Sequence, residues 1–443
     1  MSPVAPDEAE AELLTIGWRC AVCGAQRPIA EPFTWTCSHA SALDRHHAPQ
    51  IVQRLAPLRA SDEQNPFLAF RRYLAWDSFA ASVGLGESAR HALVEELDEH
   101  VAEVAGTGFI TTPFGRADAL SDALGFSVDG GIWVKDETHN VAGSHKSRHL
   151  FGILLHLVTA ERNGLAPWRS PFDRPSLAIA SCGNAAVAAS TLAAAVGWPI
   201  RVFVPEGADL AVVAMLDQLK ATVVVCPRLD TDAPGDPCVH RFREAVGDGA
   251  VPFSVQGTEN AWCLDGGRTI GWEMARHMEE RVEGPPIDRI FVQVGGGAFA
   301  ACVSSGFGMS GITPRLHAVQ TNACAPLDRA WQLAEAMGGV REAAQHWGEC
   351  MWPWEAVGNS AADGILDDET YDWIPVMKAM ADGYGEPVVA HESHVLDANV
   401  HGRRHTGIHA SHTGTAGLAG LLAIREQIAD DERIAVVFSG VQR

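Results

Sequence analysis

The chain is poor in basic residues. Among its 443 residues, 33 are lysine or arginine and 55 are aspartate or glutamate, which gives a formal net charge of -22. Such an excess of negative charge repels phosphate backbones and anionic lipids, so we expect no nucleic acid and no membrane among the partners. Lysine is especially scarce, at four residues, and a lysine in an unusual setting therefore stands out.

The chain also lacks the marks of export. Its N-terminal stretch, MSPVAPDEAEAELLTIGW, has no basic segment followed by an apolar run, so we predict no signal peptide. Apolar runs such as LFGILLHLV are too short to span a bilayer. The ten cysteines do not have the density of a secreted disulfide scaffold. The sequence therefore predicts a reduced, cytoplasmic protein.

Short apolar strands alternate with alanine-rich helices from about residue 106 onward. Segments such as GIWVKDE, SLAIAS and IRVFVPE have the pattern of buried strands, and NAAVAASTLAAAVG has that of a helix. Continuous apolar strands that alternate with helices indicate parallel sheets covered on both faces. We therefore predict an α/β fold, in which ligands bind beyond the carboxyl ends of the strands.

One of these strand ends carries a lysine between two histidines. In VKDETHNVAGSHKSRH, Lys146 follows a glycine turn and begins a predicted helix. The positive end of the helix dipole and the neighbouring His145 and His149 would disfavour its ammonium form. A lysine with a lowered pKa forms a Schiff base with a carbonyl. The same spacing also fits an exposed lysine in the first turn of a helix.

A second strand end is the turn in ASCGNAAVAAS, which contains Ser181, Cys182, Gly183 and Asn184. The amide of Asn184 can bind a flat ligand, while Ser181 and the free N–H groups of the helix start can bind a carboxylate. Asn184 is also a natural N-cap residue. The two interpretations are compatible.

The third and fourth strand ends are rich in glycine. In VQVGGGAFAACV, Gly295, Gly296 and Gly297 follow a strand and open a helix, where backbone N–H groups can surround a phosphate. This is not the dinucleotide-binding pattern G-x-G-x-x-G. In VVFSGVQR, Ser439 ends a strand, and its hydroxyl either bonds a ring nitrogen or simply terminates the strand.

Together the four segments describe a ligand with an aldehyde, a phosphate and a ring nitrogen, which is pyridoxal phosphate. In these motifs and their order, residues 106–443 resemble the fold type II pyridoxal phosphate enzymes, which include threonine synthase, serine and threonine dehydratases, cysteine synthase and the tryptophan synthase β subunit. The resemblance implies two three-layer α/β domains with mostly parallel sheets, and a homodimer. We predict a large domain at 106–150 and 255–443, a small domain at 151–254, and a cysteine-rich extension at 1–105.

The resemblance also implies a role for each motif. Lys146 would carry the cofactor and move the α-proton of the substrate. Asn184 would face the 3-hydroxyl of the cofactor, and Ser439 would face the pyridine nitrogen. The predicted phosphate cradle consists of Gly295, Gly296, Gly297 and Ala298. The predicted substrate-binding residues are Ser144, His145, Ser181, Cys182 and Gly183.

A neutral hydroxyl beside the pyridine nitrogen favours elimination and replacement over transamination. We therefore predict a lyase that acts on a hydroxy amino acid or a related small amino acid, through an aminoacrylate. AGSHKSRH looks more like the tryptophan synthase β subunit, whereas SCGNAAVAAS looks closer to the dehydratases. Threonine synthase and a β-replacement synthase are therefore alternatives. A cofactor-binding protein without turnover is a further one, against which the intact lysine and glycine triplet argue.

The N-terminal region contains the segment WRCAVCGAQRPIAEPFTWTCSH. Cys20 and Cys23 form a C-x-x-C pair, and Cys37 and His39 follow. Three thiolates and one imidazole complete a tetrahedral structural zinc site. His46 or His47 is an alternative to His39, and three reduced cysteines packed in a small subdomain are the alternative to zinc. The segment is similar to the zinc-ribbon-like start of some threonine synthases.

Four histidines lie close together near the C-terminus, in HGRRHTGIHASHTGTAG. Four-residue spacing can stack imidazoles on one helix face as metal ligands. The interspersed glycines favour a loop that lines the mouth of the active site, where Arg403 or Arg404 would bind an anionic substrate group.

Overall fold

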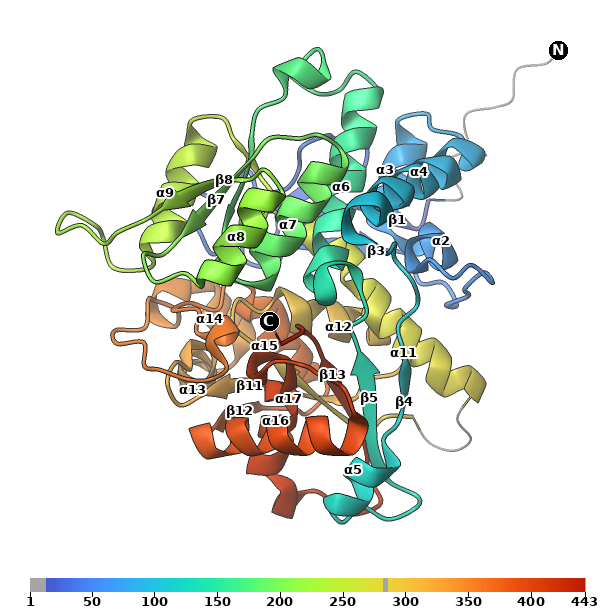
Figure 1. The fold of residues 1–443 in the computed structure, drawn as a ribbon, viewed down its shortest axis with the longest axis vertical. Helices are drawn as coiled ribbons and strands as arrows, with labels where there is room; N and C mark the ends of the chain where they lie inside the picture. The colour runs from blue at the N-terminus through green and yellow to red at the C-terminus, as the bar shows by residue number, and fades with distance from the viewer. Residues whose placement is uncertain (1–12, 282–285, 443) are drawn as a thin grey trace.

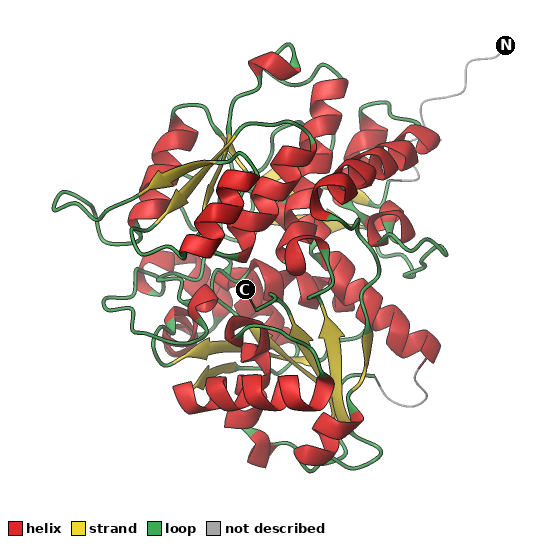
Figure 2. Cartoon of the chain, in the orientation of Figure 1, coloured by secondary structure: helices red, strands yellow, loops and turns green. Residues whose placement is uncertain are grey.

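The computed structural model describes residues 13–281 and 286–442. Figure 1 shows two sheet-containing halves, one above the other, with the N-terminal elements beside the upper half. Figure 2 shows helices on both sides of the strands in the lower half. No helix in the described part of the chain is long and apolar enough to span a membrane.

The larger sheet has six strands in the order β12-β11-β10-β13-β5-β4. Every neighbouring pair is parallel except β4 and β5, which are antiparallel. The strands are β4 (Phe114–Arg116), β5 (Gly131–Asp136), β10 (Arg289–Gln293), β11 (Arg315–Thr321), β12 (Pro387–Ala390) and β13 (Arg433–Phe438). The apolar side chains of these strands belong to two separate hydrophobic cores, one on each face of the sheet.

Helices cover both faces of this sheet and so make three layers. One core is shared with α11 (Arg268–Arg281), α12 (Ala298–Met309), α13 (Pro326–Met337), α14 (Val340–Gln345) and α15 (Trp373–Asp382). The other is shared with α5 (Asp118–Ala123), α16 (Glu392–Thr406) and α17 (His412–Ala423).

The smaller sheet has four parallel strands in the order β8-β7-β6-β9. They are β6 (Leu177–Ala180), β7 (Ile200–Val204), β8 (Thr222–Val225) and β9 (Val251–Pro252). The helices around it are α6 (Lys146–Arg162), α7 (Asn184–Ala195), α8 (Leu210–Gln218) and α9 (Pro237–Gly247). The predicted α/β class with mostly parallel sheets is therefore confirmed, while the exact domain bounds stay a prediction.

The N-terminal region packs against the rest of the chain. It contains an antiparallel sheet of β1 (Thr15–Cys20), β2 (Gln26–Pro28) and β3 (Pro49–Gln53), followed by α2 (Pro66–Ala69), α3 (Ala75–Ser82) and α4 (Glu87–Ala105). Its apolar side chains share one core with α6 and α7. The carboxylate of Asp265, in α10 (Cys263–Gly266), accepts the N–H groups of Ala75 and Trp76 at 2.8 Å each. The buried carboxylate of Asp265 therefore holds the start of α3 against α10.

The histidine-rich segment differs from the predicted loop. α16 continues to Thr406, so His401 and His405 lie on a helix, with their rings stacked at 5.6 Å. The loop prediction was wrong for residues 401–406, where Gly402 is a packing residue: a Cβ at this position would lie 3.0 Å from the ring of Phe438. Residues 407–411, which include His409, do form a loop between α16 and α17. Arg403 and Arg404 are exposed near the end of α16, which lies along the lower side of the large sheet in Figure 1, away from the smaller sheet.

Candidate active site

The turns predicted to carry chemistry meet where the two halves face each other. The backbone N–H of His145, after β5, donates to the hydroxyl of Ser439, after β13, at 3.1 Å. The side chain of Asn184, at the start of α7, lies against Gly440, where a Cβ would be 2.5 Å from its Nδ2. The structure thus brings together three strand ends that are far apart in sequence.

Lys146 is the first residue of α6, as predicted. The turn before it has left-handed backbone at Ala142 (φ 56°) and Gly143 (φ 69°). Gly143 cannot be replaced easily, because a Cβ would also lie 2.7 Å from Val441. Burial lowers the pKa of the Lys146 amine, and the charge of Asp367 opposes this shift. Lys146 therefore has the fixed position and the lowered pKa that a nucleophilic amine requires.

The two imidazoles beside Lys146 act differently from the prediction. Burial, and then the charge of Lys146, lowers the pKa of His145 well below its usual value and that of His149 to about 3. Both rings are therefore neutral and do not repel an ammonium group. The ring of His145 stacks on Phe299 at 3.9 Å, and its Nδ1 lies 2.5 Å from the hydroxyl of Ser439. Burial, rather than charge repulsion by the histidines, is the main cause of the shift at Lys146.

The glycine triplet follows β10 and opens α12, which begins at Ala298. Gly297 is in left-handed backbone, with φ at 98°. Asp367 lies in the turn so formed: a Cβ on Gly295 would be 2.1 Å from its Oδ2, and the backbone of Gly296 hydrogen-bonds its carboxylate. One backbone N–H of the cradle therefore already binds a carboxylate oxygen, and a phosphate bound there would have to replace it.

Other atoms of the site also fit the predicted cofactor. The hydroxyl of Ser144 and Nε2 of His145 are buried and have no hydrogen-bond partner among the described residues. Unsatisfied polar atoms of this kind are expected where a polar ligand binds. Ser181, Gly183 and Asn184 are half-buried at the start of α7, and Cys182 is exposed. Asn184 is the first residue inside the helix and Gly183 occupies the N-cap position, so the N-cap interpretation of Asn184 was wrong.

Three acidic residues of the site escaped the sequence analysis. Asp367, Glu369 and Asp372 lie in a segment that follows the glycine triplet by about seventy residues and passes directly over it. Oδ2 of Asp372 accepts the N–H of Gly257 at 2.8 Å, whereas its buried Oδ1 has no partner in the described structure. Burial raises the pKa of Asp372 to about 7, against the opposing effects of Gly257 and of the charge on Lys146.

Because its pKa is raised, Asp372 is expected to lower the stability of the folded protein once the pH is high enough to ionise it. The unfolded carboxyl ionises near 3.8 and the folded one near 7, so the wild type should lose stability relative to Asp372→Asn as pH rises between these values. The expected difference is about 4 kcal/mol above pH 7 and none near pH 4. Urea denaturation of both proteins at several pH values measures it. A constant difference at all pH values would contradict the assignment.

A buried ion network supports the start of α6. Arg148 donates to Glu137 at 2.9 Å and to Glu273 at 2.5 Å, and Lys135 also donates to Glu273. All four side chains are at most 1% exposed. The network ties β5, α6 and α11 together two residues beyond Lys146. Its only sequence signal is the presence of charges inside otherwise apolar segments.

The N-terminal cysteines form a second cluster. The ligand atoms of Cys20, Cys23, Cys37 and His47 all lie within 4.8 Å of one another. Sγ of Cys20 is 3.3 Å from Nδ1 of His47, and Sγ of Cys23 is 3.5 Å from Sγ of Cys37. His39, the histidine predicted from the spacing, is exposed and contacts Cys37 through its backbone N–H at 3.4 Å. The imidazole that the fold brings to the thiols is therefore that of His47.

The turn before His47 connects this cluster to the segment over the cradle. Asp44 accepts from Nε2 of His47 at 3.1 Å and from Nε1 of Trp347 at 2.6 Å. Arg45 forms an ion pair with Glu369, and Nε2 of His46 lies 3.4 Å from the same carboxylate. The cysteine cluster and the candidate active site are thus joined through side chains of three consecutive residues.

A protein-family model described as "Pyridoxal-phosphate dependent enzyme" matches residues 107–440 of the chain. The chain therefore belongs to this family of enzymes, which act on small amino acids, and the resemblance found in the four motifs is confirmed. No curated protein sequence matches the chain.

Several solved structures are similar in fold. A threonine deaminase from T.th. is 19% identical, with a TM-score of 0.59, and the match covers 79% of this chain and 98% of that one. A maize serine racemase is 17% identical, with a TM-score of 0.56 and coverages of 79% and 93%. An L-serine ammonia-lyase from Rhizomucor miehei is 16% identical, with a TM-score of 0.57 and coverages of 75% and 94%. These likenesses establish the fold.

Proposed function

We propose that the chain eliminates the β-substituent of a hydroxy amino acid such as serine or threonine and releases an oxo acid and ammonia. The observation that carries this proposal is the combination of Lys146, whose pKa burial lowers, with a neutral partner at the end of β13. The hydroxyl of Ser439 is bonded to His145, whose own pKa is lowered by burial, so that no charged group is supplied there. The similarity in fold to a threonine deaminase and an L-serine ammonia-lyase supports the same reaction class.

Each group of the site has a task in this reaction. Pyridoxal phosphate supplies an electron sink for the carbanion at the substrate α-carbon when it is bound. The Lys146 amine takes the α-proton, and the ammonium group so formed gives a proton to the β-hydroxyl, which leaves the β-carbon as water. The helix start at Ser181–Asn184 binds the substrate carboxylate, and Gly295–Ala298 hold the phosphate. The enamine that is released reacts with water to give the oxo acid and ammonia.

The test is a product assay on the purified holoenzyme with L-serine, L-threonine and O-phosphohomoserine in turn. We expect oxo acid and ammonia in equal amounts from serine or threonine. Threonine and phosphate from O-phosphohomoserine would instead identify a threonine synthase. If no amino acid yields a product while the cofactor stays bound, the proposed elimination is wrong.

We also propose that Cys20, Cys23, Cys37 and His47 bind a structural zinc ion. Three thiolates and one imidazole are a common tetrahedral zinc set. Nδ1 of His47 faces the thiols, and Nε2 bonds Asp44 at 3.1 Å. A carboxylate on the far nitrogen fixes the ring in the orientation that a metal requires.

Metal analysis tests this site. The purified protein should contain one zinc per chain, and Co²⁺ substitution should give the absorption of a tetrahedral thiolate site. His47→Ala should lower the zinc content severalfold, whereas His39→Ala, the matched control, should not. Zinc that persists in His47→Ala but is lost in His39→Ala would place the fourth ligand at His39 instead.

We propose, as the family resemblance implies, that the chain acts as a homodimer in the cytoplasm. Light scattering of the purified protein should give the mass of two chains, and the mass of one chain would contradict this.

A further inference from the structure

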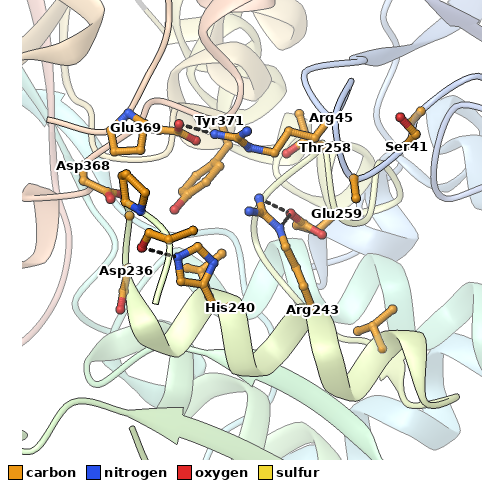
Figure 3. Close-up of a pocket in the computed structure, with 18 of the residues that line it drawn as sticks. Ser41, Arg45, Asp236, His240, Arg243, Thr258, Glu259, Asp368, Glu369 and Tyr371 are labelled. Atoms are coloured by element: carbon orange, nitrogen blue, oxygen red, sulfur yellow. Dashed lines mark hydrogen bonds and ion pairs between the residues drawn. The ribbon is translucent and has the colours of Figure 1, made fainter. Parts of the chain in front are cut away.

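A cavity of about 530 Å³ lies where several parts of the chain meet. Its walls come mainly from residues 36–45 of the cysteine-rich region, from residues at the start of α9, and from residues 368–371, and Thr258, Glu259 and Pro353 also contribute (Figure 3). Tyr371 forms the wall that this cavity shares with the glycine cradle, because a Cβ on Gly296 would lie 3.2 Å from its ring. The cavity therefore adjoins the candidate active site and shares Glu369 and Tyr371 with the segment that passes over the cradle.

The charged side chains that line this cavity include more carboxylates than basic partners for them. Two ion pairs account for four of the lining residues, namely Arg45 with Glu369 and Arg243 with Glu259. The carboxylates of Asp236 and Asp368 remain, and neither has an ion-pair partner among the described residues. Asp368 lies near the start of α9, since its Oδ2 is 3.6 Å from the Cβ position of Gly235, and the charge of Asp236 contributes to the raised pKa of Asp368 after burial and Glu369. One oxygen of Asp236 accepts the N–H of Cys238 at 2.8 Å and caps α9, which leaves its other oxygen available.

A third polar group faces the same space. Tyr371 is only 4% exposed, yet no residue drawn in Figure 3 hydrogen-bonds its hydroxyl, which points into the cavity between Asp368 and Arg243. A buried tyrosine hydroxyl normally has a partner. His240 also lines the cavity, and its Nε2 is already directed to the carbonyl of Ala233 at 3.3 Å.

We propose that Asp236, Asp368 and the hydroxyl of Tyr371 bind the ammonium group of a small ligand in this cavity. Two close carboxylates repel each other, and a cation between them removes that repulsion and forms charge-assisted hydrogen bonds. The tyrosine oxygen accepts a third ammonium proton. The volume of the cavity admits a molecule of amino-acid size.

Two kinds of ligand carry an ammonium group that this cavity could bind. One is the side-chain ammonium group of a diamino acid whose α-carbon lies at Lys146, and this version rests on the part of the proposed function that places an amino acid there, not on a β-hydroxyl group. The charge of Asp236 is near enough to Cys182, in the predicted substrate-binding turn, to contribute to the raised pKa of its thiol after burial and Asp363. The other is a free amine that binds next to the site without reacting.

Calorimetric titration of the holoenzyme tests the proposal. L-Ornithine and L-norvaline have the same carbon chain, but only ornithine carries a side-chain ammonium group. We expect ornithine to bind at least about tenfold more tightly than norvaline. Asp368→Asn and Asp236→Asn should each abolish this preference, and Tyr371→Phe should reduce it. Asp209→Asn is the matched control, because Asp209 caps α8 as Asp236 caps α9.

Putrescine and the visible absorption of the cofactor distinguish the two ligands. Ornithine that changes this absorption, with putrescine not binding, identifies a diamino acid that binds with its α-amine at the cofactor. Putrescine that binds with the same dependence on Asp368 and leaves the absorption unchanged identifies the free amine. Equal binding of ornithine and norvaline to the wild type, or a preference that survives in both asparagine variants, would overturn the proposal. None of these readings requires turnover, so a failure of the proposed elimination would not be mistaken for a failure of this site.

Discussion

Lys146→Ala is expected to lower turnover of the best amino acid substrate by about 10²- to 10⁴-fold, the range that a positioned proton-transfer group contributes. The reason is that Lys146 is the only lysine among the described residues at the meeting point of the strand ends, and its lowered pKa lets the amine accept the α-proton. Steady-state kinetics with saturating cofactor measures the loss, and a small amine such as methylamine should restore part of the rate.

The control for this variant is Lys378→Ala, which removes an exposed lysine that pairs with Asp382 on α15. Its activity should equal that of the wild type. Should Lys146→Ala retain full turnover while holding the cofactor, another group must move the α-proton and the central assignment would be wrong.

Glu273→Ala is expected to give the largest loss of stability, about 3–5 kcal/mol in the free energy of unfolding. The change leaves the buried charges of Arg148 and Lys135 short of a partner, although Glu137 still pairs with Arg148. A buried charge without its partner cannot recover its hydration energy. Urea denaturation measures the loss.

Glu96→Ala provides the matched comparison. It removes the carboxylate from an ion pair with Arg162 in which both side chains are more than 40% exposed. The expected cost is about 0–1 kcal/mol, because solvent screens such pairs. Similar losses in Glu96→Ala and Glu273→Ala would contradict the role given to the buried network.

Local patterns in the sequence were enough to predict most of the helices and strands. The helix expected at NAAVAASTLAAAVG is α7 (Asn184–Ala195), because its alanine-rich apolar pattern and the glycine that ends it are both local signals. Lys146 begins α6, and the glycine triplet opens α12, for the same reason. At Gly402 the local signal misled, because its helix is stabilised by close packing on Phe438 rather than by propensity.

The acidic part of the site could not be predicted in this way. The run DDET at residues 367–370 looks like a solvated turn, and only the tertiary fold lays it across the cradle. The same holds for His47, because chain closure between β1 and β3 decides which of three nearby histidines reaches the thiols.

The most direct test of the account is reduction of the holoenzyme with borohydride, followed by peptide mapping with mass spectrometry. Reduction fixes the cofactor covalently to the lysine that holds it. We predict one modified residue, Lys146, in the segment GSHKSRH. Modification at Lys135, Lys220 or Lys378 instead, or no modified peptide from protein saturated with pyridoxal phosphate, would contradict the account.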